Sequence, residues 1–266
     1  YHSSDVDVDL QTLEIAFDRT CNFACSYCNP AFSSTWVNDL DRNGPYVALV
    51  SDGRNHFTHT HDSSQLYRFG ERNPYVEAFF KWWDTDLHRT LKELRLTGGE
   101  PLMSGDTWRL LDWFTTNQTD MKFAMNSNLG AKPELIKRLI DATHSIDHFH
   151  LYTSNEAMGL QAEYIRDGMQ YNRVFENVHR FLDKIPYRNS LTFIITMNNL
   201  SVTGFREYME WILRLRENYS KTYQRVWFDT PVLRQPAWQS LQILPESYAA
   251  KLEACADWME TQVTTD

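Results

Sequence analysis

Short strand-like runs alternate with amphipathic helical stripes along most of the chain. In the first run Leu13, Ile15 and Phe17 alternate with polar or small residues, which is the period of a strand with one buried face. Five similar runs follow, at residues 93–97, 122–126, 149–153, 192–197 and 225–229. The segments between them repeat apolar residues at helical spacing. Six strands alternating with five helices predict an α/β fold with a parallel sheet, whose chemistry lies beyond the C-terminal ends of the strands.

Charge and composition narrow the class of protein. The chain has 266 residues, a formal net charge of −9, 42% hydrophobic residues and 23% charged residues. Such fractions are ordinary for a soluble globular protein, and the acidic balance disfavours a general nucleic-acid binder because phosphate backbones are repelled. The sequence contains no apolar run long enough for a transmembrane helix and opens with no signal-peptide pattern.

Three of the four cysteines fall within eight residues, directly after the first strand. A disulfide framework would spread its cysteines along the chain, so the cluster of Cys21, Cys25 and Cys28 predicts metal binding in a reducing, cytoplasmic compartment. Three thiolates at this spacing can each bind one corner of a cubane iron–sulfur cluster and leave the fourth iron open. A structural zinc site is the alternative, but zinc needs a fourth protein ligand and the sequence shows no second Cys or His pair at tight spacing.

The second strand ends in a glycine-rich turn that carries a carboxylate. The chain there reads Leu94-Arg-Leu-Thr-Gly98-Gly99-Glu100-Pro101. Glycines let the backbone approach a ligand closely, and a carboxylate is an acceptor for an ammonium group. Alone, such a segment is an ordinary strand-to-helix turn. Its position on the strand that follows the cysteine motif favours a role in the same site.

Together the two motifs resemble the radical S-adenosylmethionine (SAM) superfamily, over roughly residues 13–232. The spacing Cys-x3-Cys-x2-Cys after the first strand is the signature of that family, which usually has an aromatic residue before the third cysteine. The resemblance implies a partial (β/α)6 TIM-like barrel in which the three cysteines hold a [4Fe–4S] cluster. It implies that SAM chelates the open iron and is cleaved by one electron to methionine and a 5′-deoxyadenosyl radical, which abstracts hydrogen from a substrate. It also assigns SAM binding to Tyr27, Gly98, Gly99 and Glu100.

Three residues at the ends of later strands are further candidates for SAM binding. Asn126 ends the third strand, where the family often has a turn facing the cofactor, although a plain Asx turn fits equally well. Ser154 ends the fourth strand and Arg166 follows it; a serine and an arginine so placed contact the ribose or carboxylate of SAM in related enzymes. For Arg166 the alternative is a surface side chain paired with Glu163 or Asp167.

The later part of the chain also resembles the SPASM/twitch branch, whose members often modify peptides. That branch carries additional cysteines, and here only Cys255 lies downstream. The resemblance implies a peptide or small-molecule substrate and a flavodoxin- or ferredoxin-like reductant, with no membrane partner. Two alternatives remain: a radical SAM enzyme that modifies nucleic acid, which the acidic balance disfavours, and a non-catalytic metal- or SAM-binding protein, which the complete motifs disfavour.

We expect one domain over residues 1–266, with a core of about residues 11–233. Residues 40–73 are polar and rich in histidine, and we predict a lid-like insertion there. Residues 246–262 have the pattern of a final helix. Cys255 lies on its apolar face, which favours packing over a role as a hydrogen-atom donor.

Overall fold

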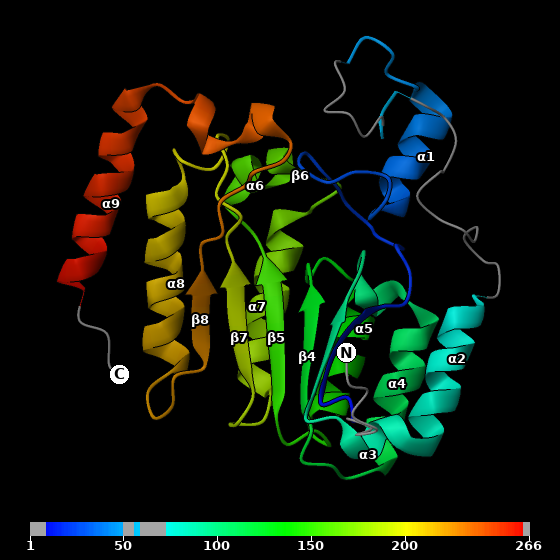
Figure 1. Cartoon of the computed structure of the whole chain (residues 1–266). Helices are drawn as coiled ribbons and strands as arrows, with labels where there is room; N and C mark the ends of the chain where they lie inside the picture. Colours follow the sequence, from blue (N-terminus) through cyan, green and yellow to red (C-terminus); the bar gives the residue numbers. More distant parts are fainter. Residues whose placement is uncertain (1–8, 50–55, 59–72, 263–266) are drawn as a thin grey trace, which may run out of the picture.

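Six parallel strands form the central sheet of this computed structural model, which describes residues 9–49, 56–58 and 73–262. The order of the strands in the sheet follows their order in the sequence, so each strand pairs with the strands that precede and follow it. Within the described residues the sheet is open, with the first and last strands at its edges (Figure 1). The strands are β1 (Thr12–Ala16), β3 (Glu93–Thr97), β4 (Lys122–Ser127), β5 (Phe149–Ser154), β7 (Ser190–Ile194) and β8 (Val226–Asp229).

The predicted alternation of strands and helices is confirmed, and the fold is that of a partial, unclosed barrel. The run expected at residues 192–197 begins two residues earlier and ends at Ile194, and Met197 pairs beyond it through an isolated bridge with Val232. The five predicted crossover helices correspond to α2 (Pro74–Trp82), α4 (Gly105–Thr116), α5 (Pro133–Thr143), α7 (Tyr171–Lys184) and α8 (Phe205–Tyr219). Helix α2 continues through a π-helical turn at Trp83–Leu87 into the short helix α3 (His88–Thr90).

Four further elements were not predicted. Helix α1 (Ser34–Asn43) follows the cysteine motif, and the short helix α6 (Gly159–Ile165) follows β5. Two-residue strands, β2 (Ala24–Cys25) and β6 (Arg166–Asp167), pair antiparallel above the main sheet. All four lie at the C-terminal ends of the parallel strands, which is where a sheet of this kind places its ligand sites.

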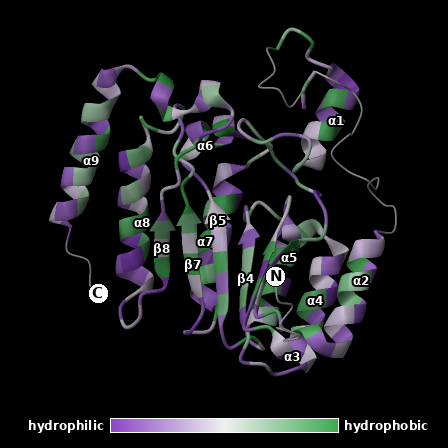
Figure 2. Cartoon of the chain, viewed as in Figure 1, coloured by the Kyte–Doolittle hydropathy of each residue, from purple (hydrophilic) through white to green (hydrophobic). Residues whose placement is uncertain are grey.

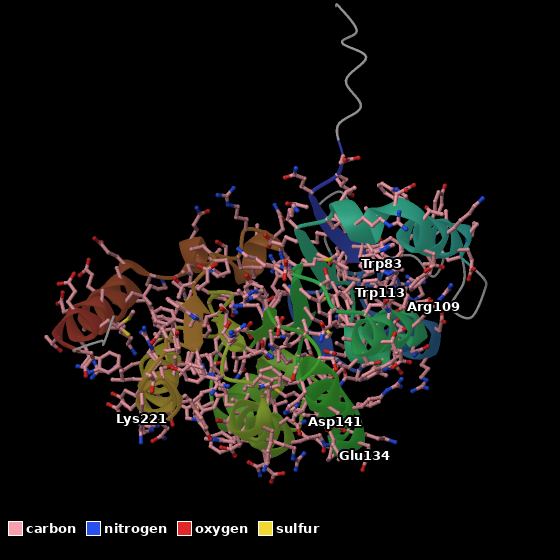
Figure 3. The ribbon with its side chains drawn as sticks, turned by 90° about the horizontal axis from the view of Figure 1, so that it is seen from below. Trp83, Arg109, Trp113, Glu134, Asp141 and Lys221 are labelled. Carbon is pink, nitrogen blue, oxygen red and sulfur yellow. The ribbon has the colours of Figure 1, made fainter. Side chains whose placement is uncertain are left out.

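The two faces of the sheet differ because side chains alternate along each strand. One face is apolar and packs against the helices, which lie outside it in an arc with α5 at the outer surface (Figure 3). Burial of each large side chain on this face stabilises the fold by about 1.5–3 kcal/mol. In Figure 2, β7 is mostly green, whereas α8 alternates between green and purple as an amphipathic helix does. Side chains on the apolar face that are 1% exposed or less include Leu94, Leu96, Phe123, Met125, Phe149, Leu151, Leu191 and Phe193.

The opposite face of the sheet carries polar and aromatic side chains, and we call it the polar face. Its members interact with one another across neighbouring strands, which shows that they share one side of the sheet. Apart from Thr192 they are half-buried or exposed. The polar face consists of Glu14, Arg95, Asn126, His150, Tyr152 and Thr192.

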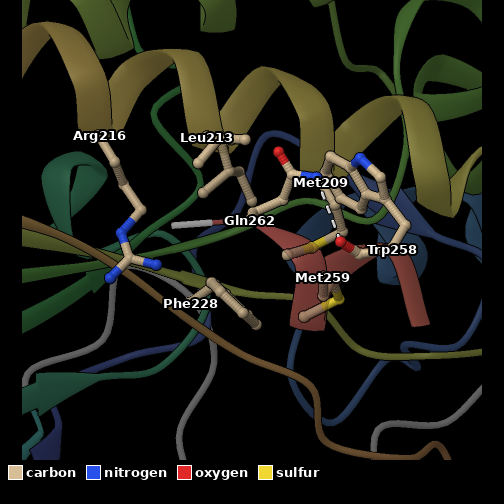
Figure 4. A pocket seen from close by; sticks show the side chains of 8 residues that line it. Met209, Leu213, Arg216, Phe228, Trp258, Met259 and Gln262 are labelled. Atoms are coloured by element: carbon tan, nitrogen blue, oxygen red, sulfur yellow. Dashed lines mark hydrogen bonds between the residues drawn. The ribbon is translucent and has the colours of Figure 1, made fainter. Parts of the chain in front are cut away.

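The C-terminal helix α9 (Ala249–Thr261) is preceded by a 3-10 turn at Glu246–Tyr248, so the helix predicted at 246–262 is present with a different first turn. Cys255 is 3% exposed and belongs to the core, in agreement with a packing role. A pocket between α8, β8 and α9 has a volume of about 80 Å³ and is lined mainly by apolar residues such as Met209, Phe228 and Met259 (Figure 4). It is much smaller than the roughly 300–1,000 Å³ of ordinary ligand pockets.

No helix in the described parts of the chain is both long and apolar enough to cross a membrane. Most of the lid-like insertion expected at residues 40–73 lies outside the described residues, and its role stays a prediction.

The loop that leads from β4 to α5 depends on one buried side chain of α7. The amide nitrogen Nδ2 of Asn177 donates to the carbonyl oxygens of Leu129 (2.8 Å) and Ala131 (3.1 Å), and Asn177 is fully buried. An Asn177→Ala variant leaves both carbonyls without this donor, and a buried unsatisfied polar group costs about 1–3 kcal/mol. We therefore expect a loss of roughly 2–3 kcal/mol in the free energy of unfolding, measured by urea denaturation.

The neighbouring Glu176 is exposed on the same helix, so Glu176→Ala serves as the control. A loss in Asn177→Ala no larger than in Glu176→Ala would show that the loop does not depend on Asn177.

Candidate functional site

The three clustered cysteines lie on a loop of residues 21–28, which we call the cysteine loop. It begins beyond the end of β1, and its middle forms β2, which pairs with β6 so that Cys25 lies opposite Arg166. Cys25 is buried, whereas Cys21 and Cys28 are half-buried. The structure therefore brings the predicted cysteines and Arg166 together at the C-terminal ends of the strands.

Burial raises the pKa of all three thiols. The pKa of Cys21 is raised to about 11 and that of Cys25 to about 12, and that of Cys28 is also raised. Repulsion from Glu100 and Cys28 adds to the rise in the pKa of Cys21. Repulsion from Cys28 and Glu156 adds to the rise at Cys25, where the Arg166 guanidinium opposes it. Since iron binds thiolates, the thiols must release protons when a cluster assembles.

The donor set fits a cluster better than a single ion. Within the described residues, no group of three or more His, Cys, Asp or Glu side chains is arranged to hold a metal ion. The ligands of one tetrahedral ion converge at about 2.3 Å from it, whereas a cubane takes one thiolate on each of several irons and so accepts wider sulfur spacing. One buried and two half-buried cysteines on one loop, with no fourth cysteine beside them, suit a cluster with one open iron.

Helix α1 secures the cysteine loop by hydrogen bonds from its first turn. The Thr35 hydroxyl donates to the carbonyl oxygen of Cys21 (2.6 Å), and the indole nitrogen of Trp36 donates to that of Cys25 (3.0 Å). The Cys21 backbone N–H donates to the hydroxyl of Ser34 (3.0 Å). These contacts satisfy buried backbone groups of an irregular loop, which would otherwise be costly.

The turn at Gly98-Gly99-Glu100 packs against the chain that enters the cysteine loop. A side chain at Gly99 would overlap the carbonyl oxygens of Arg19 and Thr20. The Glu100 backbone N–H donates to the Thr20 carbonyl at 2.6 Å. The glycine at position 99 is thus required by a close approach between two segments of backbone, and this contact joins the two sequence motifs.

The Glu100 carboxylate is fully enclosed by donors from the protein. One oxygen accepts from the backbone N–H of Leu102 (3.1 Å) and the hydroxyl of Ser127 (2.8 Å), and the other accepts from the backbone N–H of Asn128 (2.6 Å). Glu100 is 1% exposed. Burial raises its pKa to about 7, although the three hydrogen bonds work against the rise. Glu100 therefore ties the end of β3 to the end of β4.

Arg166 is buried in an ion pair with a residue that the sequence did not single out. Its Nε donates to Glu156 Oε2 at 2.8 Å, and its Nη2 donates to Glu156 Oε1 and to the Tyr27 hydroxyl. The Tyr27 hydroxyl donates to Glu156 Oε1 at 2.6 Å, and Arg166 Nη1 lies 3.5 Å from the sulfur of Cys25. Burial lowers the pKa of Arg166, but Glu156 more than offsets this and holds the pKa well above its ordinary value. The alternative of a surface pair with Glu163 or Asp167 is wrong.

The remaining predicted residues lie on strand ends. The side-chain oxygen of Asn126 accepts two hydrogen bonds from Arg95, so the amide faces a neighbouring strand. Ser154 is the last residue of β5 and is half-buried. Two residues later, Nδ2 of Asn128 donates to the side-chain oxygen of Asn22 (2.8 Å) and lies 4.0 Å from the sulfur of Cys21.

Sequence reasoning did not single out two residues that the structure places at this site, Glu156 and Asn128. Glu156 follows β5 closely, and a carboxylate at a strand end was the available signal. Asn128 lies two residues after Asn126, and the backbone N–H of Asn128 is held by its hydrogen bond to Glu100.

Comparisons with known proteins agree with this geometry. The family model described as the radical SAM superfamily matches residues 15–212, which is more than half of the chain. A protein named GTP 3′,8-cyclase from Aliarcobacter butzleri (strain RM4018) is 25% identical over 130 residues, which are 49% of this chain and 31% of that protein. A protein of the same name from Sulfurovum sp. (strain NBC37-1) is 23% identical over 130 residues, 49% of this chain and 30% of that protein. The match therefore spans about a third of the length of these relatives.

Among solved structures, the chain is similar to SuiB of Streptococcus suis. The TM-score is 0.55 at 10% identity, and the match covers 95% of this chain and 47% of that one. SuiB bound to S-adenosylmethionine gives a TM-score of 0.52 at 10% identity and covers 45% of that chain. SuiB bound to the precursor peptide SuiA gives a TM-score of 0.54 at 11% identity and covers 46% of that chain. At these identities the likeness establishes the fold alone.

Removal of either partner of the buried ion pair is expected to destabilise the chain strongly. Arg166→Gln leaves the Glu156 charge buried without a counterion, and Glu156→Gln does the same to Arg166, at about 3–5 kcal/mol each. The double variant removes both charges and should cost much less than the sum. A double-mutant cycle by chemical denaturation measures this coupling.

The exposed pair Arg206–Glu210 provides the control cycle, with an expected coupling of about 0.5 kcal/mol or less. Additive losses at Arg166 and Glu156 would contradict the coupling inferred from their burial.

Glu100 should give the chain a pH-dependent stability. Because its folded pKa of about 7 lies above the ordinary 4.5, the folded state holds the extra proton between these values. The free energy of unfolding of the cofactor-free chain is therefore expected to fall as pH rises through this window, by roughly 3 kcal/mol in total from this group.

The slope of the free energy of unfolding against pH should flatten in Glu100→Gln, whatever the absolute stability of that variant. The slope should be unchanged in the control Glu253→Gln, because the carboxylate of Glu253 is exposed on α9. Equal slopes in wild type and Glu100→Gln would show that Glu100 does not titrate in this range.

Proposed function

Because this chain belongs to the radical SAM superfamily, we propose that it abstracts hydrogen from a peptide or small-molecule substrate. When bound, a [4Fe–4S] cluster and SAM supply the reductive cleavage that yields a 5′-deoxyadenosyl radical. The observation that carries the proposal is the convergence of the three-cysteine loop, the Glu100 turn and the Arg166–Glu156 pair at one end of the sheet.

The residues of the site divide into ligands and supports. Cys21, Cys25 and Cys28 are the proposed cluster ligands, and their deprotonation accompanies cluster assembly. Arg166 lies beside Cys25 and stabilises negative charge on its sulfur, since a guanidinium is a fixed cation. Glu156 keeps that cation oriented.

The assignment of residues to SAM binding is also a proposal, and the contacts proposed for Glu100 and Asn126 take account of their hydrogen bonds within the protein. We assign the SAM side of the site to Tyr27, Gly98, Gly99, Glu100, Asn126, Ser154 and Arg166. The carboxylate of Glu100 already accepts three hydrogen bonds, so its proposed contact with an amino group would use the lone pairs that remain. Asn126 is engaged by Arg95, and its contribution would be shared with that side chain.

The substrate is proposed to lie over the polar face of the sheet. The relatives named GTP 3′,8-cyclase favour a small molecule, and the structure of SuiB with its precursor peptide favours a peptide. Both kinds of molecule carry anionic and hydrogen-bonding groups that a polar surface can bind. A flavodoxin- or ferredoxin-like reductant in a cytoplasmic compartment is the proposed electron source.

The test is anaerobic reconstitution with iron and sulfide, followed by reduction in the presence of SAM and assay of 5′-deoxyadenosine. We expect about four irons per chain and release of the nucleoside. Zinc binding without SAM turnover would overturn the proposal and return the cysteines to a structural role.

Two variants assign the ligands. Cys25→Ala should lose the cluster and SAM cleavage together, whereas Cys255→Ala, which changes a buried core cysteine on α9, should keep both. Retained cleavage in Cys25→Ala would remove that residue from the ligand set.

A further inference from the structure

Arg95 projects from the middle of β3 onto the polar face, and the site described above involves it only as the partner of Asn126. Its side chain is 32% exposed, and it lies three residues before Gly98 on the same strand. At about 3.3 Å per residue, this places Arg95 roughly 10 Å along the strand from the glycine turn. A molecule on the polar face that reaches the strand ends would pass over this guanidinium.

The guanidinium is held so that one of its two hydrogen-bonding edges is engaged and the other is not. Nε and Nη2 both donate to the side-chain oxygen of Asn126, at 3.1 and 3.0 Å, which occupies the edge that these two nitrogens share. Among residues 9–49, 56–58 and 73–262, Nη1 donates to no acceptor. The Nη1–Nη2 edge therefore presents two parallel N–H donors, the arrangement that binds a carboxylate or phosphate in a bidentate manner.

Asn126 and the Tyr152 ring fix the orientation of Arg95, and neither neutralises its charge. Its guanidinium carbon lies 4.2 Å from the centre of the Tyr152 ring, a stacking contact that limits rotation of the side chain. The Glu14 carboxylate makes its shortest contact with Arg95 at Nε, at 3.8 Å, and is 58% exposed, so the pair is weak. His150, the other titratable group here, adds no charge at neutral pH because burial, with Arg95, lowers its pKa to about 4.

Two other stacked arginines, Arg138 and Arg109, differ from Arg95 in their partners or position. Arg138 lies over the Trp108 ring, but its Nη2 already donates to both carboxylate oxygens of Asp112, at 3.0 Å each. Arg109 of α4 lies over the Phe80 ring and is paired with Glu77 on the helical layer, away from the polar face (Figure 3). Arg95 combines a fixed orientation with an unoccupied edge.

We propose that Arg95, oriented by Asn126 and Tyr152, binds an anionic group of the substrate, a carboxylate or a phosphate, through its Nη1–Nη2 edge. The inference rests on the proposed function for the identity of the ligand as substrate, and it assigns that substrate a negatively charged group roughly 10 Å from the reacting end of the sheet. Asn126 then acts as a positioning residue for Arg95.

The test is protection of Arg95 from phenylglyoxal, which modifies accessible guanidinium groups, in the reconstituted wild-type holoenzyme. Modification is followed at individual arginines by peptide mass spectrometry. One arm adds inorganic pyrophosphate and the other adds the peptide acetyl-Ala-Glu-Ala-amide, with acetyl-Ala-Gln-Ala-amide as its uncharged match. Arg109 serves as the internal control, since it is also stacked on a ring, paired with a glutamate and partly exposed.

We expect Arg95 to be labelled in the absence of anions and protected by at least one anionic probe, while Arg109 remains labelled. Protection by pyrophosphate alone identifies a phosphate site, protection by the glutamate peptide alone identifies a carboxylate site, and protection by both identifies a general anion site. Protection by neither probe, equal protection of Arg109, equal protection by the glutamine peptide, or no labelling of Arg95 without anions would overturn the proposal.

Arg95→Lys tests the geometry of the edge, because lysine keeps the charge and loses the fork. Calorimetric titration with the protecting probe should show roughly tenfold weaker binding than wild type, and Arg109→Lys should bind as wild type does. Equal affinity in Arg95→Lys and wild type would overturn the bidentate assignment. Thermal melting of each variant establishes that it is folded.

Neither readout requires turnover, so the two proposals fail separately. Arg95 protection without 5′-deoxyadenosine formation would overturn the proposed function and leave an anion site. Formation of 5′-deoxyadenosine without protection of Arg95 would overturn the anion site and leave the proposed function standing.

Discussion

The buried ion pair between Arg166 and Glu156 is the interaction on which the position of the cysteine loop depends. Arg166 lies opposite Cys25 in the small antiparallel sheet and contacts its sulfur, and Glu156 binds both the guanidinium and the Tyr27 hydroxyl. In a medium of low dielectric constant neither charge is tolerable alone. The loop therefore cannot shift away from β6 without exposing or unpairing a charge, and this constraint acts on the residues that flank Cys25.

The rest of the site is joined to this loop through backbone contacts. Gly99 allows the turn after β3 to lie against residues 19 and 20, and Glu100 connects that turn to the end of β4. Asn128 then reaches back to Asn22. Three consecutive parallel strands thus end on one connected network, which explains how a two-residue strand and an irregular loop hold three thiols in place. The polar face below this network supplies a surface where Arg95 presents an unoccupied edge to a substrate.

Much of this arrangement was predictable from the sequence, and the failures have physical reasons. The six strands and the main crossover helices follow from periodicity, because side chains on the helix-facing side of the sheet are almost completely buried. Helix α1 was missed because only Leu40 is buried along it, so it has little apolar stripe. Its start was signalled only by Ser33, whose hydroxyl accepts from the Trp36 N–H as a helix cap and donates to the Phe23 carbonyl.

The sequence by itself determined the fold class, the family and the three thiols, because hydrophobic period and the spacing of cysteines on one loop are local properties of the chain. Only the tertiary structure decided which polar groups meet. Glu156 is ten residues from Arg166 but 129 from Tyr27, and Asn126 is 31 residues from Arg95. Such pairs depend on the register between strands and on the burial that makes an unpaired charge costly, and neither can be read from the spacing of residues along the chain.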